Sequence, residues 1–125
     1  MNTPENLVYS KEHVWLRMEG DIATIGITEF AQSELGEIVF VDLPPVGKKF
    51  KKGHVFGSVE AVKTTSDLFM PVGGEIIEVN SSLENQADLV NTKSSSDGWM
   101  MKILLSDISE VNYLLSEDDY QKLVS

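Results

Sequence analysis

Short apolar runs, each interrupted by glycine, proline or acidic residues, fill most of this chain. Such runs are typical of β-strands, which are shorter than most helices and favour β-branched and aromatic side chains. The runs that predict strands cover residues 9–16, 22–27, 38–43, 54–62, 68–70, 75–79 and 99–105. The chain is therefore expected to be mainly β.

The residues between these runs predict how the strands are connected. Glu19-Gly20-Asp21 has turn chemistry that tolerates positive φ, so the first two strands should form a hairpin. Pro44-Pro45 ends a strand because proline lacks a ladder donor, and Gly73-Gly74 predicts another turn. The polar stretch 80–98 is long for a loop, and we expect residues 89–91 within it to pair with a strand.

Helical signals occur in one internal segment and in the tail. Thr28 is a good N-cap and Gly36 a good C-cap, so the residues between them predict a helix of about two turns. Asp107 followed by Glu110 resembles a capping box, and Ser116 with Asp119 repeats the signal. One or two helices should therefore end the chain.

Residues 36–41 resemble residues 74–79 in a possible internal repeat. If the likeness is real, one sheet lies on each side of an approximate two-fold axis, and both sheets cover a shared core. Six positions can also agree by chance, so both explanations stay open. The expected core includes Val39, Val41, Val59, Ile77 and Ile103.

Length and charge restrict the classes of protein that this chain can represent. We expect one domain over residues 1–125, with a β core over about 9–105 and a helical tail over about 107–124. Twenty acidic residues against ten basic residues give a net charge of −10, which disfavours nucleic-acid binding. No apolar run approaches the roughly 20 residues of a membrane helix. The start, Met-Asn-Thr-Pro-Glu, has no targeting pattern, so we expect a cytoplasmic protein. We also expect it to be a monomer.

Common catalytic and metal-binding signatures are missing from the sequence. The absence of cysteine excludes a disulfide framework, a thiolate metal site and a cysteine nucleophile. The two histidines, His13 and His54, lack a partner at metal-binding spacing, and no nucleophile elbow or phosphate-binding glycine loop occurs. We therefore expect neither a metal site nor an enzyme. The lysines of segment 48–52 read better as a solvated sheet edge than as a docking patch.

Lys63 is the one residue with a chemically suggestive setting. Small residues predict a close-packed strand before it, and the chain leaves again through Ser66-Asp67, so Lys63 should lie at the apex of a hairpin. An exposed lysine in a turn is in most cases only a surface residue. The hairpin alone leaves both interpretations open.

Longer motifs around Lys63 resemble a known family. Residues 60–67, Glu-Ala-Val-Lys-Thr-Thr-Ser-Asp, and the following residues 71–80 resemble the lipoyl attachment segment of the glycine cleavage system H protein. The likeness extends over nearly the whole chain, through segments 9–13, 23–28, 35–37, 39–44 and 89–91, Trp15, Ala31-Gln32, Gly98-Trp99 and the acidic helical tail.

The resemblance implies a fold and a modification. The fold would be a barrel-sandwich hybrid of two antiparallel sheets, as in lipoyl and biotinyl domains, with a short internal helix and a C-terminal helix. Lys63 would carry one covalent lipoate. Glu12, Glu60, Ser66 and Asp67 would hold the arm or serve recognition.

The resemblance also implies partners. The arm would carry an aminomethyl group from glycine decarboxylase (P protein) to the aminomethyltransferase (T protein), and dihydrolipoyl dehydrogenase (L protein) would reoxidise it. A lipoate ligase or a lipoyl/octanoyl transferase would attach the arm. The alternative is an H-like relay that passes lipoyl groups to 2-oxo acid dehydrogenase complexes. Val62 and Thr64 replace the methionines that usually flank the lysine in biotinyl domains, and Val62 also replaces the aspartate usual in lipoyl domains of those complexes.

Three local departures from the family pattern concern the resting place of the loaded arm. Val14 stands where many H proteins have Glu, and Glu34 stands where His is common. Serine residues replace the usual Pro-Tyr before Gly98-Trp99. The arm's amine is expected to rest against carboxylates from the segment near Glu12, the substitute acceptor, and from Asp67, and the arm should be held less tightly than in relatives with Glu at position 14.

Overall fold

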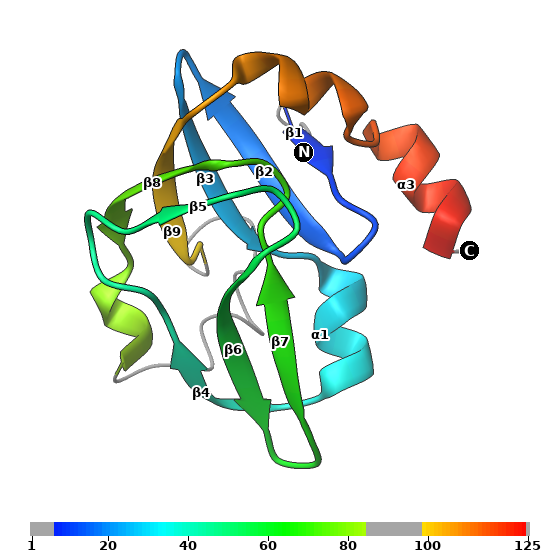
Figure 1. The fold of residues 1–125 in the computed structure, drawn as a ribbon. Coiled ribbons are helices and arrows are strands. Elements are labelled where there is room, and N and C mark those ends of the chain that lie inside the picture. Colours follow the sequence, from blue (N-terminus) through cyan, green and yellow to red (C-terminus); the bar gives the residue numbers. More distant parts are fainter. Residues whose placement is uncertain (1–6, 85–98, 125) are drawn as a thin grey trace.

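The computed structural model describes residues 7–84 and 99–124, which form two antiparallel sheets (Figure 1). The larger sheet has the strand order β1-β2-β3-β9-β8-β5 and the smaller has the order β4-β6-β7. The strands are β1 (Leu7–Tyr9), β2 (Val14–Glu19), β3 (Ile22–Ile27), β4 (Ile38–Asp42), β5 (Lys49–Phe50), β6 (Val55–Ala61), β7 (Thr65–Phe69), β8 (Gly74–Val79) and β9 (Met101–Leu105). The expected mainly β fold is confirmed.

The helices lie near the predicted positions. Helix α1 (Glu29–Leu35) begins after Thr28, whose hydroxyl accepts a hydrogen bond from the Ala31 N–H, and ends at Gly36 with φ of 81°. A 3-10 helix covers Ser81–Glu84. In the tail, a 3-10 helix (Ile108–Tyr113) precedes helix α3 (Glu117–Val124). The Ser116 hydroxyl accepts from the Asp119 N–H, as a cap does.

Three local predictions were wrong. The predicted strand 9–16 is two strands, because a tight turn with His13 at φ 68° separates β1 from β2. Gly74 begins β8 rather than forming a turn. Glu110 does not close a capping box; its side chain instead accepts a hydrogen bond from the Gly73 N–H at 2.8 Å, which ties the tail to the sheet. The predicted pairing of residues 89–91 lies outside the described residues.

Apolar side chains of both sheets form one buried cluster. Val41, Val59 and Ile103 belong to it as predicted. Val39 and Ile77 do not, since they are 49% and 36% exposed.

The reason for this error is a β-bulge in each strand. In β4 the register shifts between Ile38 and Phe40, and in β8 it shifts between Ile76 and Glu78, so Val39 and Ile77 are extra residues. A bulge lets two successive side chains point outward. The two bulges occupy equivalent positions of the similar segments 36–41 and 74–79, which lie in different sheets. This supports the internal repeat.

Tyr120 of α3 fixes the tail to the body, together with the backbone hydrogen bonds between Leu115 and Tyr9. The buried Tyr120 hydroxyl lies 2.8 Å from Nδ1 of His13 and 2.7 Å from Oγ1 of Thr28. Its ring stacks on Tyr9 at 4.6 Å between centroids. The tail therefore holds the turn between β1 and β2.

Candidate functional site

Lys63 lies at the tip of the hairpin that joins β6 to β7, as predicted. The Ala61 N–H donates to the Thr64 carbonyl at 2.7 Å and closes the turn, and the Val62 N–H donates to the Glu37 carbonyl at 3.1 Å. Lys63 itself is exposed. Figure 1 shows the tip projecting at one end of the molecule, away from the helical tail.

The base of this hairpin is closely packed. β6 is the central strand of its sheet and pairs with both β4 and β7. Val59 is fully buried beneath it. A Cβ atom added at Gly57 would overlap the Asp42 carbonyl oxygen, so only glycine permits this approach of β6 to β4. The tip thus stands on a rigid support.

Three of the other predicted site residues lie on the same hairpin. Glu60 is exposed and follows Val59 on β6, while Ser66 and Asp67 lie on β7 opposite Val59 and Ser58. Asp67 lines an open cavity of about 420 Å³, together with residues that include Asp42, Lys48 and Phe50.

Glu12 lies elsewhere, in the turn between β1 and β2. It lines a second cavity, of about 280 Å³, together with Lys52 and the tail residues Tyr113, Leu114 and Leu115. The structure therefore groups Glu60, Ser66 and Asp67 but places Glu12 and Asp67 in different cavities. Val14, the departure from the family's Glu, is buried in the apolar cluster at 1% exposure.

The region around the tip is strongly acidic. Residues 29–42 and 55–69 contain six acidic residues, while Lys63 is the only basic residue in these two segments. The exposed carboxylates are Glu34, Glu37, Asp42, Glu60 and Asp67. The lysines of segment 48–52 lie elsewhere, on and beside β5, which forms one edge of the larger sheet as predicted.

Two features of the structure were missed by sequence reasoning, one in the tail and one beside the hairpin. One is Tyr120, whose burial raises its pKa above the usual 10.0, while the hydrogen bond to Thr28 acts in the opposite direction. The other is Phe40, which is 51% exposed beside the hairpin. The possible repeat could have indicated the exposure of Phe40. The equivalent residue in segment 74–79 is the charged Glu78, and a charged residue at that position is expected to face water.

The described residues contain neither a metal-binding cluster nor a membrane-spanning helix. Within residues 7–84 and 99–124, no group of three or more His, Cys, Asp and Glu side chains could hold a metal ion. In the same ranges, no helix is long and apolar enough to cross a membrane.

Comparisons with known proteins agree along the whole chain. The model of the glycine cleavage H-protein family matches residues 7–125. Glycine cleavage system H proteins of Bacteroides thetaiotaomicron and Bacteroides fragilis are 49% and 46% identical over 125 residues, which are 100% of this chain and 99% of each relative. The crystal structure of a glycine cleavage system H protein from Mycobacterium marinum has a TM-score of 0.87 at 32% identity, covering 96% of this chain and 97% of that chain.

Two small antiparallel sheets with a lysine at an exposed hairpin tip are the architecture of lipoyl-type carrier domains. Within this class of carrier domains, the family model, the two relatives and the solved structure all match one family. The chain belongs to the glycine cleavage H-protein family. The resemblance seen in the sequence is confirmed, and these matches do not favour the lipoate relay.

Proposed function

We propose that Lys63 carries a covalent lipoyl group and that this group is the arm through which the chain works in the glycine cleavage system. The observation that carries the proposal is the placement of Lys63, exposed at the tip of a rigid hairpin in a chain of this family. Family membership gives the carrier role itself, that of a component of the glycine cleavage system.

The setting of Lys63 suits acylation. Its unprotonated amine would attack the carbonyl carbon of an activated lipoyl donor, such as an acyl adenylate. The new C–N bond forms as the bond from carbon to the phosphate oxygen breaks, and the amine proton goes to a base. The product is an amide, so the positive charge of Lys63 is lost. All charged side chains of segments 29–42 and 55–69 would then be carboxylates.

When bound, the lipoyl group supplies a dithiolane that accepts an aminomethyl group. The residues of this chain hold the root of the arm in a fixed place, while the arm itself stays free to move between enzymes. We propose glycine decarboxylase, the aminomethyltransferase and dihydrolipoyl dehydrogenase as the partners that load, unload and reoxidise it. A lipoate ligase or a lipoyl/octanoyl transferase would attach it.

Carboxylates of the hairpin would hold the loaded arm. The aminomethyl amine is cationic at neutral pH, and a carboxylate in a shielded position binds such a group by a charge-assisted hydrogen bond. Asp67 lines the cavity nearest the β6–β7 strands, so we propose it as the acceptor, with Glu60 and Ser66 serving recognition. Glu12 would act only if the arm reaches its separate cavity. Faster loss of formaldehyde and ammonia from loaded Asp67→Ala than from loaded Glu12→Ala would support Asp67 as the main acceptor. Equal rates would contradict it.

The test of the carrier function is a reconstituted glycine cleavage reaction. The native chain, treated with a lipoate ligase, lipoate and ATP, should support glycine-dependent release of CO2 with the three partner enzymes. Lys63→Arg should abolish it, because a guanidinium is not acylated in this way. Lys49→Arg is the matched control, since Lys49 is also exposed. Equal activity of Lys63→Arg and the native chain would refute the proposal.

Three further properties belong to the same proposal. We propose that the 125 residues form one domain, because Tyr120 of the tail stacks on Tyr9 of the first strand. We also propose that the protein is a monomer, which sedimentation equilibrium tests. Its proposed cytoplasmic location is testable by cell fractionation with an antibody against lipoyl-lysine.

A further inference from the structure

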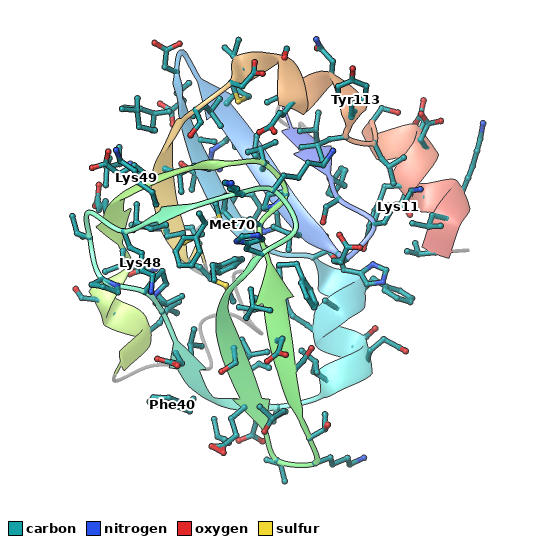
Figure 2. All side chains as sticks on the ribbon, in the orientation of Figure 1. Lys11, Phe40, Lys48, Lys49, Met70 and Tyr113 are labelled. Carbon is teal, nitrogen blue, oxygen red and sulfur yellow. The ribbon has the colours of Figure 1, made fainter. Side chains whose placement is uncertain are left out.

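Exposed apolar side chains lie beside the Lys63 tip. Val62 precedes Lys63 in the turn and is 68% exposed, while Val39 and Phe40 on β4 are 49% and 51% exposed. We call Val39, Phe40 and Val62 the tip patch. The hydrogen bond from the Val62 N–H to the Glu37 carbonyl joins the turn to the segment leading into β4. Figure 2 shows Phe40 projecting outward at the hairpin end of the molecule.

The tip patch is close enough to Lys63 to share one interface with it. Phe40 pairs with Glu60, which precedes Lys63 by three residues. Three residues span roughly 10 Å along a strand, at about 3.3 Å per residue, so Phe40 lies roughly 10 Å from Lys63 along the strand direction. A transient interface covers up to about 600 Å² of one partner, which corresponds to a disc of about 14 Å radius. An enzyme centred on Lys63 would therefore cover Phe40.

The fold does not require an aromatic residue at position 40. The equivalent position after the bulge of β8 is Glu78, which faces Lys102 across the sheet with Nζ and Oε1 3.9 Å apart. A charged residue thus fits the same backbone geometry. At position 40, by contrast, half of a large apolar side chain is in contact with water. This exposed half does not contribute to the stability of the folded chain.

The charges around the tip patch indicate which kind of surface would complement it. The exposed carboxylates of Glu37, Asp42 and Glu60 surround it, and residues 29–42 contain no basic residue. A complementary surface has an apolar pocket for Phe40 with Lys or Arg side chains at its rim.

We propose that the tip patch is the docking surface for the enzyme that forms the amide bond at Lys63. This inference rests on the proposed lipoylation of Lys63 and names the surface that this step uses. The attaching enzyme must bring its reacting carbonyl carbon into contact with Nζ of Lys63, so its surface has to lie against the tip. Enzymes that work on the dithiolane meet it at the far end of the arm, and they can remain farther from the patch.

The test is the steady-state rate of lipoylation of the full chain by a purified lipoate ligase with lipoate and ATP, followed by intact mass. Phe40→Ala should raise KM about tenfold or more with little change in kcat, as expected for loss of an aromatic anchor away from the reacting atoms. Phe40→Leu should restore most of the native KM. KM of the native chain should also rise with salt, because the surrounding charges are exposed.

Tyr113→Ala is the matched control. Tyr113 is also an exposed aromatic residue, at 78%, and Figure 2 places it at the opposite end of the molecule from Phe40. Its KM should equal that of the native chain. The thermal unfolding midpoints of the variants show whether both remain folded.

Each remaining outcome decides against the inference. An unchanged KM for Phe40→Ala, an equal rise for Tyr113→Ala, or an effect on kcat alone overturns the docking surface while Lys63 is still modified in the native chain. A KM of the native chain that does not respond to salt overturns the basic rim. A native chain without an adduct at Lys63 overturns the proposed function and the docking surface together.

Discussion

β4 and β8 have similar sequences and the same bulge, yet they present different outer surfaces. β8 lies between β9 and β5 within the larger sheet, and its outward Glu78 faces Lys102. β4 lies at the edge of the smaller sheet, and its outward residue is Phe40. The inward residues Ile38 and Ile76 are both buried. The comparison indicates that folding constrains the inner face equally in both strands, whereas the outer face of β4 is free to serve binding.

The largest effect should come from the inner positions of the two strands. Ile38→Ala and Ile76→Ala should each lower the free energy of unfolding by about 2–5 kcal/mol, because each leaves a cavity in the shared core. Val39→Ala and Ile77→Ala should cost about 0.5 kcal/mol or less, since both side chains are exposed at the bulges. Urea unfolding of the four variants measures this. Equal costs at bulged and inner positions would show that the bulges are placed wrongly.

The two ends of the molecule also differ in how they are fixed, because the tail contacts the turn between β1 and β2, whereas the hairpin tip is bonded to the segment before β4. Tyr120→Phe should cost about 1–3 kcal/mol, since it leaves His13 and Thr28 without the hydroxyl that they contact. It should leave lipoylation of Lys63 unchanged. A variant as stable as the native chain would contradict the role of this hydroxyl.

The same hydroxyl predicts a dependence of stability on pH. Burial raises the pKa of Tyr120 above 10.0 in the folded chain, so folding favours its protonated form. Its contribution is complete below pH 10 and is lost as pH rises through the higher pKa of the folded state. The difference in unfolding free energy between the native chain and Tyr120→Phe should therefore shrink above pH 10. A difference that grows with pH would contradict the direction of the shift.

The smallest effect on stability should come from substituting the outward residues Phe40 of β4 and Glu78 of β8. Phe40→Glu should change the free energy of unfolding by only about 0.5 kcal/mol, and so should Glu78→Ala, whose exposed ion pair contributes little. Phe40→Glu should nevertheless impair lipoylation strongly, while Glu78→Ala should not. A large loss of stability in Phe40→Glu would mean that Phe40 is a folding residue.

Local sequence signals predicted most of the strands, the capped helix α1 and the position of Lys63. They could not predict the bulges, because an apolar pair such as Val39-Phe40 reads as a continuous strand until the partner register is known. The turn at His13 was missed because a non-glycine residue in the left-handed region is rare; its backbone is closed locally by hydrogen bonds of His13 and Val14 with Ser10, and the His13 ring contacts Tyr120 of the tail. Glu110 was assigned to a local cap, but its partner is Gly73 in another part of the fold.

Lys63, among all the lysines of this chain, is the residue proposed to carry the arm. The most direct test of this proposal is peptide mapping by mass spectrometry after the full chain has reacted with a lipoate ligase, lipoate and ATP. We expect a single lipoyl adduct per chain, on the peptide that contains Lys63, and no adduct in Lys63→Arg. A lipoyl adduct on another lysine, or an adduct that persists in Lys63→Arg, would contradict it.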